Sequence, residues 1–256
     1  MSAFDPIQTL LQRYRQLEHH QNPELAQQLA NIQLWQKKRM EHTHAELFAN
    51  PNHLLISQYF LNRLYGGPDF EQLAGQFERV LVVAHKVAKL APESAVHTGT
   101  LGIELAVMAI ELDEDLARLV YRDFGHQGEL NDAVMIRAYL AANQQDARLH
   151  QMDLLDELGN RLDKYVRSFI IQSAFKMAKG TAYKHNFAPL YDFTAEGFAA
   201  MKPLASAEDF IGVFTAAERD TVERVHGGDP YPFRAATAQG HDHAPHPPEL
   251  MGALSN

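Results

Sequence analysis

Apolar residues recur along this chain at spacings of three and four, which place them on one face of an α-helix. No segment shows the strict alternation of apolar and polar residues that marks a half-buried β-strand. Asp5-Pro6 and Asn22-Pro23 each combine a capping side chain with a proline for the first turn, and Ser206 precedes another helical segment. The pattern predicts an all-α protein, a multi-helix bundle of about nine helices.

Two of the predicted helices have no polar face. The segment 52–65 carries leucine, isoleucine, phenylalanine and tyrosine around its whole circumference, and the segment 94–112 is the most apolar in the chain. A helix that is apolar on every side is normally surrounded by other helices. We therefore expect both segments at the centre of the bundle.

Single residues suggest where two further helical segments begin or bend. Asp113 is expected to cap a short helix that ends near Phe124, because aspartate favours the position before a helix. A longer helical pattern runs from 144 to about 179, and a bend is expected near Gly159, since glycine weakens a helix interior. Both expectations depend on local preference alone.

The composition changes after Gly228. Residues 229–256 are rich in proline, histidine, alanine and glycine and contain few core residues, which predicts one helical domain, residues 1–228, and a disordered tail. Histidine-rich segments can bind zinc, nickel or copper, but in a disordered segment we prefer incidental composition. The histidines in question are His241, His243 and His246.

The overall composition narrows the class of protein. The 256 residues include no cysteine, which excludes disulfide bonds, thiolate metal sites and cysteine nucleophiles. Hydrophobic residues make up 46%, enough for a sizeable core, and the net charge of −9 argues against a general nucleic-acid binder. No basic segment precedes an apolar run near Met1, and the most apolar stretch, 96–112, is too short and too charged to span a bilayer. We expect a cytoplasmic protein without a membrane span.

The segment 59–70 reads YFLNRLYGGPDF. It resembles the bacterial protein family that is named for its FFLEELY motif. Where that family has two adjacent glutamates, this chain has Asn62 and Arg63, so the local charge differs. The resemblance covers roughly residues 30–226; it implies an all-helical domain and no substrate, because the family has no assigned activity. The other similar blocks are 43–47, 111–112, 158–163, 196–201 and 209–211 with Glu218.

Two Glu-x-x-His spacings, Glu41 with His44 and Glu223 with His226, raise the possibility of a metal site. Two such pairs and two further glutamates hold a di-iron centre in some four-helix bundles. At about 100° per residue, however, these side chains lie well away from the apolar stripes of their helices. We therefore predict that they belong to solvated helix faces and that they hold no metal.

A candidate pocket combines ionisable and aromatic residues of the two apolar helices. Glu104 shares a helix face with His97, and a carboxylate beside an imidazole can perform acid–base chemistry or bind a cation. Arg63, the one cation of its helix, is the natural partner if Glu104 is buried, and Tyr59 and Tyr65 can line a cavity. The alternative, which we favour, is that Glu104 and His97 lie on a solvent-exposed side of their helix and that the tyrosines belong to the core.

A basic region spans residues 161–184, where Asp163 is the only acidic residue. Such a region can contact phosphate, an acidic partner or a membrane surface. A solvated face is the preferred interpretation. The candidate anion-binding residues are Arg161, Lys164, Arg167 and Lys176, followed by Lys179 and Lys184.

No nucleotide-binding or hydrolase motif is present, so the sequence identifies no cofactor and does not decide whether the protein is an enzyme. Three hypotheses follow. The first is a non-catalytic protein that binds a partner or self-associates through its helix faces. The second is an enzyme or carrier that holds a small ligand between the central helices. The third is anion or nucleic-acid contact through the region 161–184.

Overall fold

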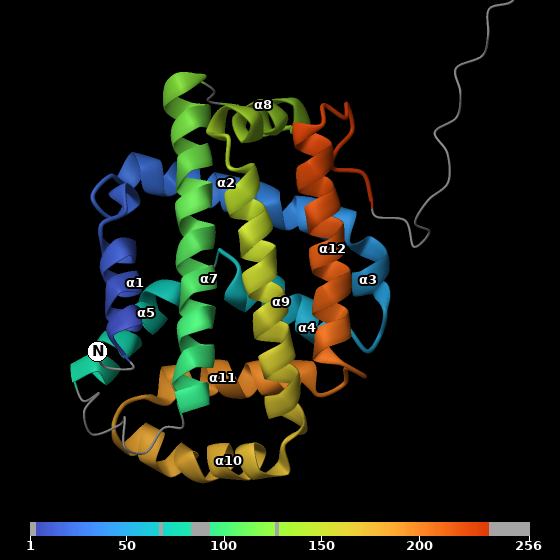
Figure 1. The fold of residues 1–256 in the computed structure, drawn as a ribbon. Helices are drawn as coiled ribbons and strands as arrows, with labels where there is room; N and C mark the ends of the chain where they lie inside the picture. Colours follow the sequence, from blue (N-terminus) through green and yellow to red (C-terminus); the bar gives the residue numbers. More distant parts are fainter. Residues whose placement is uncertain (1–3, 67–68, 83–92, 126–127, 236–256) are drawn as a thin grey trace, which may run out of the picture.

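The computed structural model describes residues 4–66, 69–82, 93–125 and 128–235, and it is built from helices (Figure 1). Within these residues there are eleven α-helices and no strand, so the all-α prediction is confirmed and the expected number of helices was too low. The helices are α1 (Asp5–Arg15), α2 (Pro23–Thr43), α3 (Ala45–Ala49), α4 (Leu54–Tyr59), α5 (Asp69–Val82), α7 (Glu93–Arg118), α8 (Asp132–Ala142), α9 (Gln145–Arg167), α10 (Phe169–Lys184), α11 (Ala188–Met201) and α12 (Ala207–His226).

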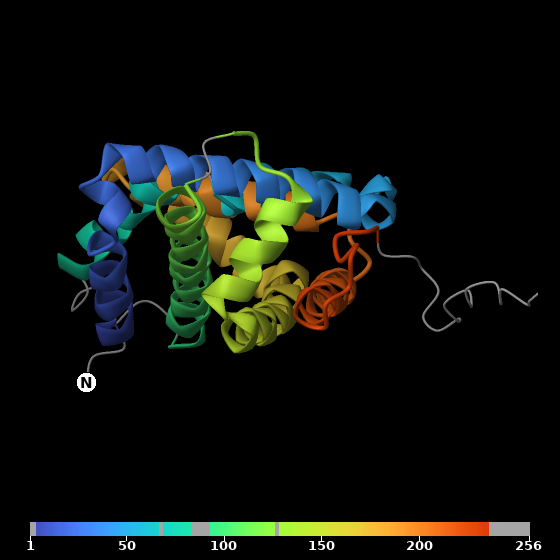
Figure 2. The ribbon, with the colours of Figure 1, turned by 90° about the horizontal axis from the view of Figure 1, so that it is seen from above.

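Four helices, α1, α7, α9 and α12, stand side by side as a row in Figure 1. Helices α2 and α11 cross the same face of this row, α2 near one end and α11 near the other (Figure 2). Helix α10 lies beyond α11 and forms the lower edge of the molecule in Figure 1. The architecture is therefore one row of helices with two helices laid across it.

Helix α7 is the central element, as predicted for residues 94–112. Its Ile103 and Val107 pack against α1, and its Leu116, which is fully buried, packs against α2 and α8. The helix does not end before Asp113, which was expected to start a separate helix. It continues to Arg118 and then forms a π-helical turn, because the carboxylate of Asp113 points into the protein and finds hydrogen-bond partners there.

The segment 52–65 is less central than predicted. It forms α4 and a π-helical turn, with Ile56 and Leu61 buried. Leu54, Leu55 and Leu64 remain 49%, 48% and 43% exposed. The main neighbour of the segment 52–65 is α11, which covers one side of it. The prediction that other helices surround this segment is therefore wrong.

The helix expected from 144 to about 179 is divided at Ser168 and not at Gly159. The Ser168 hydroxyl accepts a hydrogen bond from the backbone N–H of Ile171 and so begins α10 as a new helix. Gly159 lies inside α9 where α12 comes close: a Cβ atom there would lie 2.9 Å from Cδ1 of Ile211. The glycine therefore serves close helix packing, and the polar Ser168 makes the corner.

Part of the predicted tail is folded. Phe233 is 5% exposed, and its ring packs edge-on against Trp35 with 5.0 Å between the ring centroids. Pro232 and Phe233 therefore belong to the core, while Tyr231 and Arg234 remain exposed. The prediction of disorder is wrong for residues 229–235, because one large aromatic side chain suffices to anchor a short segment. The three tail histidines lie outside the described residues.

One stretch among the described residues, Glu93–Asp123, is long and apolar enough to cross a membrane by length and composition alone. It is longer than the sequence predicted, because α7 continues past Asp113. Helices α1, α2, α8 and α9 pack against α7, and 33% of its most apolar window is buried.

Candidate functional site

Two of the five candidate pocket residues face α11. The Tyr59 hydroxyl donates a hydrogen bond of 2.9 Å to the backbone carbonyl of Phe193. Arg63 forms an ion pair with Glu196, in which Nε lies 3.0 Å from Oε2. Arg63 thus has a partner other than Glu104, and this pair fastens α4 and its π-helical turn to α11.

The other three candidates lie in three different places. The Tyr65 hydroxyl donates a 2.5 Å hydrogen bond to Asp113 inside the protein. His97 is more than half exposed, with Nε2 3.5 Å from a Glu157 carboxylate oxygen. Glu104 lines a surface cleft. The five residues that the sequence grouped into one pocket are therefore not brought together.

A buried polar cluster occupies the middle of the molecule instead, where α2, α7, α8, α9 and α12 meet. Apart from its Tyr65, each member is at most 9% exposed. Polar groups at this depth are costly unless they are paired. The members are Gln36, Arg39, His44, Tyr65, Asp113, Tyr139, Arg148 and Glu218.

One half of the buried polar cluster is centred on Glu218. Arg39 donates a hydrogen bond to its carboxylate, and His44 Nε2 lies 2.6 Å from the same oxygen. Burial alone would raise the pKa of Glu218, but the charge of Arg39 and the hydrogen bond with His44 outweigh burial and lower the pKa to about 2. The carboxylate is therefore ionised, and Arg39 and His44 both contact its Oε1 atom.

His44 corrects the interpretation of the Glu-x-x-His spacings. It is 3% exposed and stacks on Phe214 at 4.3 Å between ring centroids, whereas it was predicted to be solvated. Glu41 and Glu223 are exposed, as expected from their positions on their helices. Among the described residues no group of three or more His, Cys, Asp or Glu side chains can hold a metal ion. His44 serves as a core partner of Glu218.

The other half of the cluster is centred on Asp113. Its carboxylate accepts from Tyr65 and, at 3.5 Å, from the Gln36 amide, while Arg148 Nη2 lies 4.0 Å away. Burial raises the pKa of Asp113 despite these partners. Gln36 joins the two halves, because its carbonyl oxygen accepts a hydrogen bond of 3.2 Å from Arg39. Gln36 lies at helical spacing with Ile32 and Met40, and a polar residue on such an apolar stripe is a sequence signal of a buried polar group.

The cavity beside the buried polar cluster is small. Its volume is about 30 Å³, which is room for about one water molecule. Arg39 and Arg148 line it, and the Nε–H group of each has no protein partner among the described residues. Phe233 closes the cavity from the C-terminal segment. The space is too small for a substrate, so the cluster serves the packing of the helices.

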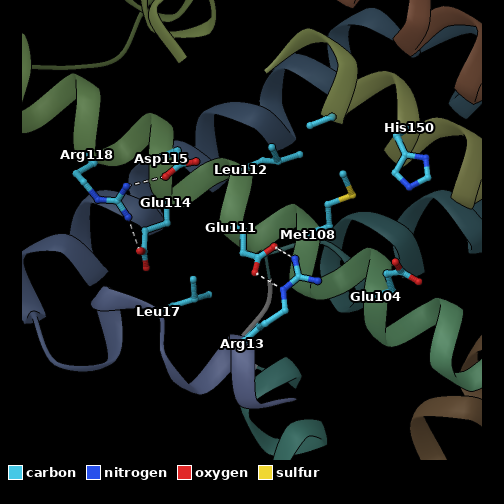
Figure 3. Close-up of a pocket in the computed structure, with 11 residues that line it drawn as sticks. Arg13, Leu17, Glu104, Met108, Glu111, Leu112, Glu114, Asp115, Arg118 and His150 are labelled. Carbon is cyan, nitrogen blue, oxygen red and sulfur yellow. Dashed lines mark hydrogen bonds and ion pairs between the residues drawn. The ribbon is translucent and has the colours of Figure 1, made fainter. Parts of the chain in front are cut away.

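A larger cleft of about 540 Å³ opens between α1, α7 and α9 (Figure 3). Arg13 is held by Glu111 through two hydrogen bonds of 2.6 and 3.1 Å near its middle. Glu104 and His150 lie at the end away from Arg118, and neither has a hydrogen bond or ion pair among the described residues. The cleft therefore has a neutralised part and a part with a free carboxylate.

Glu114, on the wall of this cleft, has a structural role. Its carboxylate accepts hydrogen bonds from the backbone N–H groups of Glu18 and His19, at 3.2 and 3.1 Å, and contacts the His19 ring. Burial alone would raise the pKa of Glu114, but these hydrogen bonds lower it to about 2. Glu114 thus fastens the turn after α1 to α7.

The structure divides the predicted anion-binding residues into two pairs. Arg161 pairs with Glu157 at 2.7 Å, and Arg167 pairs with Asp163 at 2.9 Å. In each ion pair the acidic residue lies one helical turn earlier. Lys164 and Lys176 are exposed and have no hydrogen bond or ion pair among the described residues. The cations that remain available are therefore lysines.

The exposed side of α10 combines Lys176 and two further lysines with apolar residues, and we call it the α10 face. Phe169, Ile170 and Met177 are 84%, 79% and 78% exposed, and no residue of α10 is buried. The sequence pattern indicated that this segment is basic but not that its apolar residues are exposed, because periodicity does not show which helix face other elements cover. The α10 face consists of Phe169, Ile170, Met177, Lys176, Lys179 and Lys184.

Comparison with protein-family models matches residues 15–232 to a domain of unknown function, DUF8198. Comparison with curated proteins and comparison with solved structures each found no match. The family match agrees with the expectation of an uncharacterised family and does not address the FFLEELY motif or a bacterial origin.

Proposed function

This chain belongs to the DUF8198 family, and we propose that it is a non-catalytic binding protein whose α10 face docks onto a negatively charged macromolecular surface. The observation that carries the proposal is the exposure of Phe169, Ile170 and Met177, each close to 80%. Large apolar side chains gathered on one exposed face mark interaction sites. We place the protein in the cytoplasm, which suits a chain without cysteine.

The charge of the α10 face selects the sign of the partner. The whole chain has a net charge of −9, yet residues 164–184 contain five cations and no acidic residue. One of these cations, Arg167, is paired with Asp163, and four lysines are left, three of them on the α10 face. A local positive field attracts anions even on an acidic protein. It also disfavours self-association through this face, because two copies would bring lysines together.

The buried polar cluster supports a role without catalysis. Its ionisable groups have perturbed pKa values, which is a property of many active sites. Glu218 lines a cavity of only about 30 Å³, however, which is too small to admit a substrate, and Asp113 does not line it. Their perturbed pKa values follow from burial and pairing, so the α10 face is the better candidate for the function.

Retention on immobilised poly-L-glutamate at neutral pH and low salt tests the proposal. An acidic protein without a functional basic face flows through such a matrix. We expect the protein to be retained and K176Q/K179Q/K184Q to elute at lower salt, whereas K38Q, which removes an exposed lysine of α2, behaves as wild type. Unretained wild-type protein would overturn the proposal. Tighter retention by duplex DNA than by polyglutamate would instead support nucleic-acid contact.

The cleft supports a second candidate function, a carrier or enzyme for a small cation. Glu104 has no partner among the described residues and lines a space of about 540 Å³ with three further acidic side chains. Calorimetric titration with spermidine, a flexible polyamine, tests this. We expect binding that E104Q weakens and that E93Q, on the same helix outside the cleft, leaves unchanged. Absence of spermidine binding would remove this candidate and leave the first in place.

A further inference from the structure

We propose that the anionic surface is a lipid bilayer and that α10 is an interfacial helix that lies in the headgroup region. The inference rests on the proposed function and names the partner of the α10 face. It depends on three observations: the position of α10 in the fold, the arrangement of its side chains and the identity of its cations.

The position of α10 suits contact with a flat surface. In Figure 1 it runs across the lower edge of the molecule, crosswise to α7, α9 and α12, and no other labelled helix lies beyond it. An interfacial helix lies in the plane of the membrane with one side toward the acyl chains. A bilayer beneath α10 in this view would meet the outer side of the helix along its length.

The opposite side of α10 fixes its orientation on the protein. Phe175 stacks on Tyr191 of α11, with 4.4 Å between the ring centroids and 2° between the ring planes, and it packs edge-on against Phe198. These contacts orient Phe175 toward α11. The α10 face therefore points outward because the other side of the helix is held by aromatic packing.

The large exposed apolar side chains of α10 lie on one side of the helix. At about 100° per residue, Phe169, Ile170 and Met177 share one arc of about 100°, and Lys184 lies within it. Lys176 lies beside Phe169 at the border of the arc. Lys179 lies about 80° from Phe169, on the side toward Phe175, and its ammonium group is 5.5 Å from the centroid of the Tyr183 ring. Apolar side chains flanked by lysines match a helix that places its apolar stripe below the headgroups and its ammonium groups among the phosphates.

The identity of the cations favours lipid over a protein partner. All three cations of α10 are lysines: Lys176, Lys179 and Lys184. Protein–protein interfaces are depleted of lysine and enriched in arginine, tyrosine and tryptophan. At a membrane surface the long lysine stem lies along apolar surface while its ammonium group reaches the water and the lipid phosphates. Each lysine near an anionic bilayer contributes about a fivefold factor in binding, so three contribute about a hundredfold.

Co-sedimentation of the full chain with vesicles tests the inference. The probes are vesicles of phosphatidylcholine alone and vesicles of phosphatidylcholine with phosphatidylserine. We expect binding to the anionic vesicles alone, reduced about a hundredfold in K176Q/K179Q/K184Q. F169S/M177S should reduce binding at least about tenfold, because it removes the apolar contribution and keeps the charge.

A matched control lies on α2. Leu34 is 54% exposed and Lys38 is exposed one turn later, so L34S/K38Q removes the same residue types from another face. It should bind anionic vesicles as wild type does. All these positions are exposed, so unchanged circular dichroism and thermal midpoints are expected to establish that each variant folds.

The outcomes separate this inference from the proposed function. Retention on polyglutamate without binding to anionic vesicles would overturn the lipid inference and keep the docking role. Vesicle binding that F169S/M177S does not weaken would also overturn it, because a merely electrostatic contact needs no apolar stripe. Failure to bind either probe would overturn both proposals.

Discussion

The buried polar cluster and the α10 face reverse the usual distribution of residues in opposite ways. In the cluster, charged groups such as Arg39 and Glu218 are at least nine-tenths buried. On the α10 face, Phe169 and Met177 are about four-fifths exposed. The two regions differ in pairing. The buried charges pair with one another, although the Nε–H groups of Arg39 and Arg148 lack a protein partner among the described residues, whereas the apolar side chains of the α10 face are mostly exposed to solvent. The first arrangement stabilises one packing of the helices, and the second leaves a surface ready for a partner.

A residue with a perturbed pKa and an exposed apolar residue indicate different things about function. A perturbed pKa at Asp113 or Glu218 follows from burial and partners within the protein and serves its internal packing. An exposed Phe169 has no such explanation within the described residues, since water is a poor solvent for it. An apolar side chain that stays exposed to water without a contact in the fold is therefore the better indication of a functional surface.

Glu218→Gln gives the largest expected effect. The substitution leaves the Arg39 guanidinium buried without its carboxylate partner, which costs about 3–5 kcal/mol in the free energy of unfolding. Urea denaturation measures this loss. Glu223→Gln on the exposed side of the same helix is the control, with an expected change within about 0.5 kcal/mol. Equal losses in the two variants would contradict the view that the cluster stabilises the packing.

Phe233→Ala tests whether the C-terminal segment closes the cluster. Phe233 is buried against Trp35 and borders the small cavity, so truncation is expected to cost about 3 kcal/mol in the free energy of unfolding. The same urea titration applies. Tyr231→Ala, two residues earlier and 76% exposed, should leave stability within about 0.5 kcal/mol of wild type. A similar small change in both would place the segment outside the core.

The pH dependence of stability follows from the two glutamates with lowered pKa values. Glu218 and Glu114 have folded-state pKa values of about 2, below the ordinary value of 4.5. Each therefore contributes stability that is present above pH 4.5 and is lost as the pH falls toward 2. The raised pKa of Asp113 acts in the opposite direction and offsets part of the loss.

Glu114→Gln should flatten this acid-side slope and lower stability at neutral pH by about 2 kcal/mol. Denaturation midpoints between neutral and acidic pH measure both effects. Glu104→Gln, on the same helix and without a partner among the described residues, serves as the control and should keep the wild-type slope. An unchanged slope in Glu114→Gln would show that its carboxylate contributes no such stabilisation.

F169S/M177S gives the smallest expected change in stability. Because both side chains are about four-fifths exposed, we expect the free energy of unfolding to change by no more than about 0.5 kcal/mol, with a correspondingly small shift of the thermal midpoint. This is expected although the α10 face has lost two of its three large apolar side chains. Differential scanning calorimetry measures the midpoint. A loss of several kcal/mol would mean that the α10 face belongs to the core, and the contrast between the two regions would disappear.

Features that depend on neighbours in sequence were predictable. Asn22 and Ser206 cap α2 and α12 as expected, by accepting hydrogen bonds from backbone N–H groups three residues later. Asp5 lies within the first turn of α1 and does not cap it through its side chain. Local sequence therefore predicted most helices and their starts, because capping and helical periodicity act over one or two turns.

Features of the candidate site were mostly not predictable. Periodicity indicated which residues share a helix face, but it did not indicate which element covers that face. His44 was assigned to water and lies in the core, because α12 brings Glu218 and Phe214 to it. Phe169 was part of an apolar helical pattern and lies in water, because α10 turns away at Ser168.

The sequence by itself determined that this protein is all-helical, that α7 lies at its centre and that the region 161–184 is basic, since these properties are local or additive along the chain. Only the tertiary structure decided which charges are paired and which apolar side chains stay exposed. The physical reason is that burial and pairing depend on contacts between helices far apart in the chain, such as Arg39 with Glu218.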